Sequence, residues 1–468
     1  MKSDRPSLTS PALQALLAVG AGICTYWVLA SELAIRRVRE FAQPLGLDNA
    51  YFLQRTWQAA FLDAPQRTLL ATETGEGLIA GRHFEPILAL IVPLVRAAPS
   101  METLLVFQVG LIGFGAVGAY RIGTSLGLDR PVSVLLSWTW LALPGVWAMG
   151  TLDFRTFSLA APLVVCALAA LLETRLILGA VLLLLAATCR EEVALLYLLA
   201  APALAWQGRV KKDFRPAWVV AGVGVAWTAL VVVLHSEDWG FIQPGELVVQ
   251  TYDSLGGPGA SRALEMLYGQ IGGNLALAVI APLTSLGILA TWLSAGAMQA
   301  LLNATAVHIF AVAIALMAWV HALFLARIGG FLQTRLPTHS RHALRASAGL
   351  LFVCTFMGNA HIRMPTPIDE PDAWQLIRKI PTTSAVLTQS RYSPALATRP
   401  EIYVSDDWKD EEGISKLIER VEWVLLPERH NWLPRLEDEG FRWLESKGGV
   451  VLLQGPQRLV TPGHLTPE

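Results

Sequence analysis

The stretch LILGAVLLLLAATCREEVALLYLLAAPALAW, residues 176–206, decides the class of fold. Apart from Arg190, Glu191 and Glu192 it is almost entirely apolar, and a membrane-spanning helix needs about 20 consecutive apolar residues. Charged residues make up 16% of the chain, whereas soluble proteins have roughly 25%, and the mean hydropathy is +0.47. The sequence therefore predicts a polytopic membrane protein and argues against a soluble enzyme.

Apolar runs recur along the whole chain and predict a mainly α-helical bundle of about 11 spans. Residues 84–97 hold a run too short to span, so we expect a re-entrant or steeply tilted segment there, with a shallow hairpin as the alternative. The expected spans are residues 11–30, 101–120, 131–149, 156–173, 176–190, 192–207, 217–235, 271–287, 288–304, 308–326 and 344–360.

The basic loops predict the orientation, because Lys and Arg are retained on the cytoplasmic side of a membrane. The N-terminus is then inside, and residues 31–83, the turns at Asp153 and Glu191, and the tail are outside the cytoplasmic membrane. The basic residues counted inside are Arg121, Arg130, Arg209, Lys211, Lys212, Arg215, Arg327, Arg335, Arg341 and Arg345.

The composition changes after Pro365 and predicts a small soluble α/β domain. Residues 372–379 have a helical pattern, and residues 384–388, 421–426 and 449–453 have the pattern of buried strands. We therefore expect a transmembrane bundle at 1–360, with a first outer loop at 31–83, and an extracytoplasmic domain at 361–468.

Several classes of partner and site are not indicated. The net charge of −1 favours neither nucleic acid nor a polybasic membrane anchor. The four cysteines stand singly in apolar segments, which predicts buried packing rather than a zinc site or disulfide framework. The chain has no Walker motif and no GxGxxG before a helix.

Charged side chains gather at the predicted outer ends of helices. Ionisable groups at membrane depth cost on the order of 2.5–3.5 kcal/mol and usually face a cavity or one another. Acids there could deprotonate an acceptor hydroxyl or hold a divalent cation, and Arg or His could stabilise a departing phosphate. The clusters are Asp48, His83 with Glu85, Asp153 with Arg155, and Arg190 with Glu191 and Glu192.

Each cluster also has a structural interpretation. Asp48 with Asn49 could cap a helix that begins at Ala50. Glu85 before Pro86 could be a first-turn acid favoured by the helix dipole. For the remaining residues, Asp153 with Arg155 could be a surface pair, the Arg190 group a structural ion pair, and His308 a packed residue at a helix start.

The order of four motifs resembles a family of polytopic membrane proteins, domain of unknown function family 2079. The motifs are the Asp48–Trp57 stretch, His83-Phe84-Glu85-Pro86, Leu152-Asp153-Phe154-Arg155 and Cys189-Arg190-Glu191-Glu192, followed in the tail by Ile380-Pro381-Thr382-Thr383-Ser384-Ala385-Val386. The family is similar in layout to the GT-C glycosyltransferases, which implies a GT-C-like bundle.

The resemblance also implies roles for individual residues. The catalytic acid of the first outer loop in GT-C enzymes corresponds to Asp48, although Asn49 stands where an Asp-Glu pair is typical. Phe84-Glu85-Pro86 resembles the Phe-Glu-Lys-Pro motif of aminoarabinose transferases without its lysine, so Arg82, His83 or Arg155 would supply the positive charge. Asp153 resembles an acid that lies in a later turn of GT-C enzymes, and Arg190 corresponds loosely to the lysine-bearing turn that follows it in those enzymes.

Two functions follow as hypotheses. The first is a glycosyltransferase that moves a sugar from a polyprenyl-phosphate carrier to an acceptor outside the membrane; the alternative is a transporter, or a scaffold whose outer domain binds a partner. Metal dependence, including a divalent cation, and oligomeric state are left open. In the first hypothesis the catalytic residues are Asp48, Glu85 and Asp153, and the substrate-binding residues are Arg82, His83, Arg155, Arg190, Glu191, Glu192 and His308.

Overall fold

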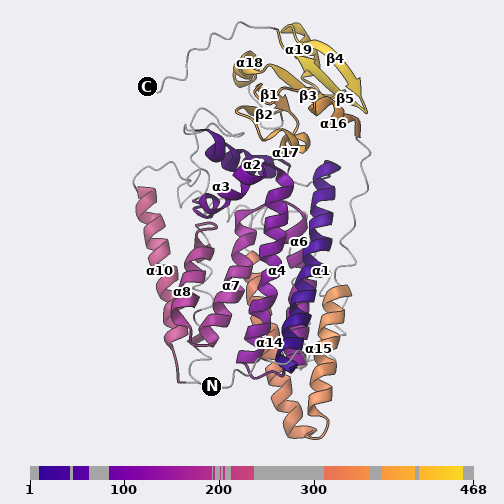
Figure 1. The fold of residues 1–468 in the computed structure, drawn as a ribbon. Helices are drawn as coiled ribbons and strands as arrows, with labels where there is room; N and C mark the ends of the chain where they lie inside the picture. Colours follow the sequence, from indigo (N-terminus) through magenta and orange to yellow (C-terminus); the bar gives the residue numbers. More distant parts are fainter. Residues whose placement is uncertain are drawn as a thin grey trace, which may run out of the picture. The chain divides into compact units, whose positions relative to one another are not determined.

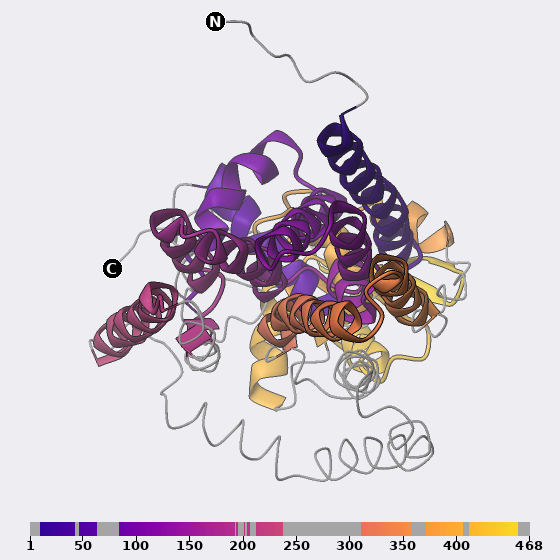
Figure 2. The same ribbon diagram turned by 90° about the horizontal axis from the view of Figure 1, so that it is seen from below.

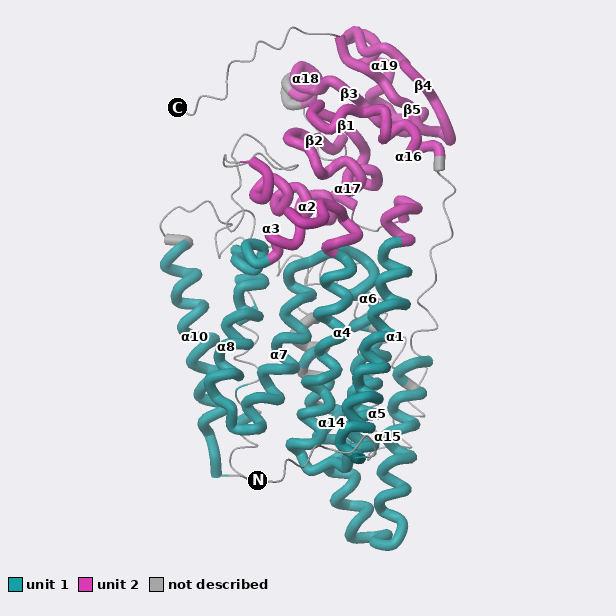
Figure 3. The backbone as a smooth tube through the Cα atoms, viewed as in Figure 1, with its two compact units in different colours: residues 1–35, 78–90, 105–364 teal, residues 36–77, 91–104, 365–468 magenta. Residues whose placement is uncertain are grey.

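The chain forms two compact units, which are coloured separately in Figure 3. Unit 1 comprises residues 1–35, 78–90 and 105–364, and unit 2 comprises residues 36–77, 91–104 and 365–468. Unit 2 thus contains both residues 36–77, which are most of the expected first outer loop, and the tail at residues 365–468. The computed structural model describes residues 10–42, 46–62, 84–191, 193–194, 201, 204–205, 212–236, 310–357, 371–405 and 411–456.

Unit 1 is a helical bundle, and the described part of the chain contains three helices long and apolar enough to cross a membrane: α1, α4 and residues 215–234 of α10. The bent pair α5–α6 would make a fourth. Parts of α1, α3 and α4 belong to unit 2. The helices are α1 (Pro11–Arg39), α3 (Ile87–Ala97), α4 (Met101–Ser125), α5 (Arg130–Ala142), α6 (Pro144–Thr151), α7 (Thr156–Leu172), α8 (Leu176–Ala187), α10 (Arg215–Ser236), α14 (Phe310–Arg335) and α15 (Ser340–Met357).

Most expected spans coincide with a helix, but several boundaries were wrong. Helix α1 continues to Arg39, so the first part of the expected outer loop is helical. Helix α14 continues to Arg335, which places Arg327 inside a helix instead of a loop. The expected spans at 271–287 and 288–304, and most of 192–207, lie outside the described residues.

The span expected at 131–149 is broken in the structure. Helices α5 and α6 meet at 51°. Pro144 begins α6, and the residue before a proline is disfavoured in the helical region. Leu143 accordingly has φ −60° and ψ 127°, an extended conformation that ends α5.

Aromatic side chains tie helices of unit 1 together through backbone carbonyls. The Trp140 indole N–H donates to the Ile112 carbonyl and that of Trp138 to the Ala18 carbonyl, each at 3.1 Å. The Tyr26 hydroxyl donates to the Val146 carbonyl at 3.0 Å. Buried aromatic N–H and O–H groups need such partners. Helices α14 and α15 lie side by side in both views, and they pack against α7 and α5 (Figures 1 and 2).

Ion pairs gather at the end of α7 that carries Leu172. Asp129 caps α5 by accepting the Val132 N–H at 3.0 Å, and its carboxylate also accepts Arg345 at 2.9 Å. The Arg121 Nε donates to the Glu173 carboxylate at 2.7 Å. Three basic residues that we assigned to one side of the membrane, Arg121, Arg130 and Arg345, therefore lie in or beside these contacts.

Unit 2 contains a mixed five-stranded sheet in the order β2-β1-β3-β5-β4. Strand β1 runs parallel to β2 and β3, and β5 runs antiparallel to β3 and β4. The strands are β1 (Val386–Thr388), β2 (Ile402–Val404), β3 (Trp423–Pro427), β4 (Arg442–Lys447) and β5 (Val450–Gln454), and the helices are α2 (Gly46–Phe61), α16 (Pro371–Ile377), η3 (Ser390–Tyr392), α17 (Ser393–Leu396), α18 (Glu411–Arg420) and α19 (Leu433–Asp438).

The expected helix at 372–379 and the three expected strands are confirmed by α16, β1, β3 and β5. Strands β2 and β4 were missed, and β4 is a charged, largely exposed edge strand without an apolar run. Gly448 and Gly449, at φ 57° and 77°, make the tight turn from β4 to β5. Such two-residue hairpins require positive φ at both positions.

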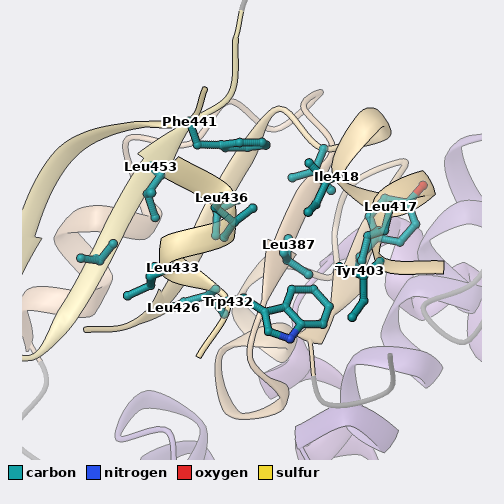
Figure 4. Packing of buried hydrophobic residues seen from close by; sticks show 14 of the residues in the cluster. Leu387, Tyr403, Leu417, Ile418, Leu426, Trp432, Leu433, Leu436, Phe441 and Leu453 are labelled. Atoms are coloured by element: carbon teal, nitrogen blue, oxygen red, sulfur yellow. The ribbon is translucent and has the colours of Figure 1, made fainter. Parts of the chain in front are cut away.

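The core of the tail lies between the sheet and its helices (Figure 4). Leu387 and Leu426 from the sheet, Leu417 and Ile418 from α18, and Leu436 from α19 are all at most 2% exposed.

The expectation that the cysteines are buried holds for only some of those whose side chains the structure describes. Cys189 is buried as expected, but Cys24 on α1 is exposed, so the expectation was wrong there.

Candidate functional site

Glu85 joins the segment before α3 to the start of α7. Its side chain is 1% exposed, and its Oε1 accepts a hydrogen bond from the Thr156 hydroxyl at 2.5 Å. Buried carboxylates require such donors, because their desolvation is otherwise costly. Helix α3 begins only at Ile87, so the expectation that Glu85 is a first-turn acid was wrong. Its hydrogen-bond partner instead lies on another helix, α7.

The turn after α8 also makes hydrogen bonds to the segment before α3. The Phe84 N–H donates to the Glu191 carboxylate at 2.8 Å, and the Ile87 N–H donates to the Thr188 carbonyl at 3.0 Å. Arg190, between these partners in sequence, is 8% exposed. Arg190 and Glu191 are therefore part of a packed junction.

Gln108 of α4 organises the third turn. Its side-chain amide donates to the Met149 carbonyl at 2.6 Å and to the Asp153 carbonyl at 2.8 Å. Its Oε1 accepts the Arg155 N–H at 2.8 Å, and the residue is fully buried. Sequence analysis missed Gln108, although a lone amide within an apolar run is a recognisable signal.

Asp153 and Arg155 are 6% and 7% exposed. The interpretation of these residues as a surface pair was wrong. Arg155 directly precedes Thr156, the partner of Glu85, so the turn that carries both charges adjoins the Glu85 segment.

Unit 1 thus brings the described members of three of the four expected clusters together in a charged junction, defined by Glu85, Asp153, Arg155, Arg190 and Glu191. It contains three carboxylates and two guanidinium groups. Carboxylates can accept protons, and guanidinium groups bind phosphate oxygens through paired hydrogen bonds. The described part of the chain shows no group of three or more His, Cys, Asp or Glu residues arranged to hold a metal ion. Four further expected site residues, Arg82, His83, Glu192 and His308, lie outside the described residues.

Asp48 belongs to unit 2, where it lies in the first turn of α2. The helix begins at Gly46, so the expectation that Asp48 caps a helix starting at Ala50 was wrong. An acid in the first turn is still favoured by the helix dipole. The buried face of α2 includes Tyr51 and Arg55, whose guanidinium donates to the Tyr51 hydroxyl at 2.8 Å.

Solved structures with a similar fold are GT-C glycosyltransferases. ArnT from Cupriavidus metallidurans bound to undecaprenyl phosphate has a TM-score of 0.56 at 12% identity, over 96% of this chain and 100% of that chain. Its apo state has a TM-score of 0.54 with the same identity and coverage. Archaeoglobus fulgidus AglB, in complex with an inhibitory peptide and a dolichol-phosphate, has a TM-score of 0.45 at 12% identity, over 93% of this chain and 74% of that chain.

At this identity the likeness to ArnT concerns the fold alone, and it confirms the expected GT-C-like architecture. No curated protein matches the chain. The model of the family described as predicted membrane protein (DUF2079) matches residues 44–340, which is more than half of the chain and spans the motifs around Asp48, Glu85, Asp153 and Arg190. The protein therefore belongs to the DUF2079 family of membrane proteins.

Proposed function

We propose that the protein is a membrane glycosyltransferase that moves a sugar from a polyprenyl-phosphate carrier to an acceptor hydroxyl. The charged junction of unit 1 carries this proposal, because it gathers buried acids and guanidinium groups from three turns that are distant in sequence. The fold likeness to ArnT, solved with undecaprenyl phosphate, supports the choice of carrier.

The proposed reaction is an inverting transfer. Asp48 accepts the proton of the acceptor hydroxyl, and the acceptor oxygen forms a bond to the anomeric carbon of the sugar. The bond between that carbon and the phosphate oxygen breaks, and the polyprenyl phosphate leaves with the electron pair. Arg155 and Arg190 stabilise the charge on the departing phosphate, while Glu85 and Asp153 position the substrate.

The proposed arrangement in the cell is a multi-pass protein of the cytoplasmic membrane, with about 11 spans and a re-entrant segment at 84–97. The N-terminus faces the cytoplasm, and the tail domain at 361–468 faces outside. This orientation rests on basic residues near helix ends, such as Arg121 of α4 and Arg345 of α15, because Lys and Arg near the ends of spans are retained on the cytoplasmic side.

The test is release of undecaprenyl phosphate by the purified protein in lipid nanodiscs, supplied with synthetic undecaprenyl-phosphate monosaccharides and candidate acceptors. Asp48→Asn should lower the rate by about 10²-fold or more, since a general base contributes roughly 10² to 10⁴. Asp129→Asn is the matched control, because asparagine also caps helices well and Asp129 lies at the α5 N-terminus.

A fully active Asp48→Asn variant would remove Asp48 from the mechanism. If the wild-type protein releases no carrier but moves a labelled lipid or sugar across a vesicle membrane, the transporter alternative is correct instead.

A further inference from the structure

Helix α2 begins in direct contact with the backbone of the tail. A Cβ atom at Gly46 would lie 2.3 Å from the Ser390 carbonyl oxygen and 3.1 Å from the Arg391 Cα. Both neighbours are backbone atoms, which cannot rotate away. The Gly46 carbonyl also accepts a hydrogen bond from the Ser393 hydroxyl at 3.3 Å. Only glycine permits this approach of α2 to η3 and α17.

The far half of α2 is held by a second contact with the tail. The Gln58 side-chain amide donates to the Pro400 carbonyl at 3.0 Å, and that of Gln54 reaches the Arg399 and Pro400 carbonyls at 3.5 Å. Both glutamines are at most 2% exposed. Arg399 fixes the accepting loop in turn, because its guanidinium donates to the Leu396 carbonyl at 2.7 Å and to the Pro381 carbonyl at 3.2 Å.

The chain before α2 is anchored on the same domain. The Phe41 ring stacks on Trp374 at 5.1 Å between centroids and meets the edge of Tyr392 at 5.1 Å. The Trp374 indole N–H donates to the Arg39 carbonyl at 2.8 Å. Aromatic pairs of this kind stabilise a contact beyond the burial of their area. The segment from Arg39 to Gln58 is thus attached to the tail before, at and after the start of α2.

The place of attachment follows from the sheet topology. Strand β1 is paired on one side by β2 and on the other by β3, and η3 follows the end of β1 after the single residue Gln389. Open α/β sheets bind ligands outside the carboxyl ends of strands, at the point where the strand order reverses. Here the backbone of Gly46 lies against Ser390 at this point, so a helix of the same chain occupies the edge at which such sheets bind ligands.

We propose that the tail domain is a positioning module for α2, and that Gly46 and Gln58 are positioning residues for Asp48. This role rests on the proposed function, in which Asp48 is the base. Asp48 lies two positions after Gly46, so the contact with Ser390 restricts the backbone that carries the carboxylate. A preorganised base avoids the loss of rate that follows from displacement of a reacting group by about 1 Å.

The test uses the full-length protein in nanodiscs and two readouts. Amide hydrogen exchange reports how firmly residues 46–61 are held, and release of undecaprenyl phosphate from the synthetic lipid-linked monosaccharides gives kcat and KM. Gly46→Ala should speed exchange in α2 and lower kcat at least tenfold, with KM within twofold and exchange in β3 and β5 unchanged. Alanine favours helix over glycine, so faster exchange reports the lost contact and not a weaker helix.

Gly20→Ala is the matched control, since it is the same change inside a helix with no atom within 4 Å of the added Cβ. It should match the wild type in both readouts. Gln58→Glu keeps the size of the side chain and removes the N–H donor to Pro400, so it should lower kcat in the same direction even if Gly46→Ala does not fold.

Full kcat in Gly46→Ala and Gln58→Glu, with Asp48→Asn inactive, would overturn the positioning role and leave the proposed function intact. Exchange in α2 that is unchanged in both variants would also overturn it. A wild-type protein that releases no carrier would overturn the proposed function, and the positioning role with it.

Discussion

The Phe84 N–H donates to the Glu191 carboxylate at 2.8 Å, across 107 positions of sequence. This bond joins the residue before Glu85 to the turn that carries Arg190. With the bond from Thr156 to Glu85, it makes the charged junction a single hydrogen-bonded arrangement of three turns. A substitution at Glu191 should therefore alter how Glu85 and Arg190 are positioned, even though Glu191 forms and breaks no bond in the proposed reaction.

Glu191→Ala is expected to lower the stability of the folded protein by about 1.5–3 kcal/mol, because it removes a charged acceptor from a backbone N–H. Glu191→Gln keeps an acceptor oxygen and should lose less than half as much. The measurement is the thermal inactivation half-life in detergent, followed together with transfer activity. Equal half-lives for the alanine variant and the wild type would show that the bond contributes little.

Gln108→Leu is expected to cost about 3 kcal/mol or more, because it leaves the Met149 and Asp153 carbonyls and the Arg155 N–H without the bonds that Gln108 makes. Transfer activity should fall as well, since the turn carrying Asp153 and Arg155 loses its support. The control is Phe107→Leu at the neighbouring position, which is 36% exposed. If both variants unfold at the same temperature, Gln108 does not organise the turn.

The stability of the tail is expected to depend on the ionisation of Tyr403 at alkaline pH. Burial, followed by the charge of Glu401, raises the pKa of the Tyr403 phenol above its ordinary value of 10.0. A group with a raised folded-state pKa contributes stability that is present below the unfolded pKa and is lost as pH rises through the folded one. The stability of the tail should therefore fall above about pH 10, and Tyr403→Phe should remove that part of the decline.

The measurement for Tyr403 is the unfolding of the full-length protein, followed by tryptophan fluorescence. One unfolding transition is recorded about every half pH unit between about pH 8 and 11. The difference in stability between Tyr403→Phe and the wild type should change across the alkaline range and stay constant below it. A difference independent of pH would mean that the phenol keeps the same pKa in the folded and unfolded chain.

The sequence predicted the helical class, most helix positions and three strands of the tail, because these follow from local composition. An apolar run such as 101–120 must span or be buried whatever its neighbours are. Strand β4 escaped prediction, since its charged residues Arg442, Glu445 and Lys447 suit an exposed edge. The break between α5 and α6 had a local cause in Pro144 that the apolar pattern concealed.

The sequence predicted which charged residues at helix ends are candidates for the site, but it did not predict which of them lie close together. Glu85, Asp153 and Arg190 attracted notice because charges are costly beside hydrocarbon, and that cost can be read from each segment alone. Which turns meet depends on helix packing and on partners such as Gln108 and Thr156, whose contacts with distant segments cannot be read from the sequence. The attachment of Gly46 to Ser390 likewise exists only in the folded chain, because a glycine shows its steric role only when a backbone from a distant segment lies against it. The spans and the charged turns could thus be predicted from local sequence, because solvation acts on each segment separately. The charged junction and the attachment of the helix that carries Asp48 to the tail depend on packing between distant segments, so only the tertiary structure decided them.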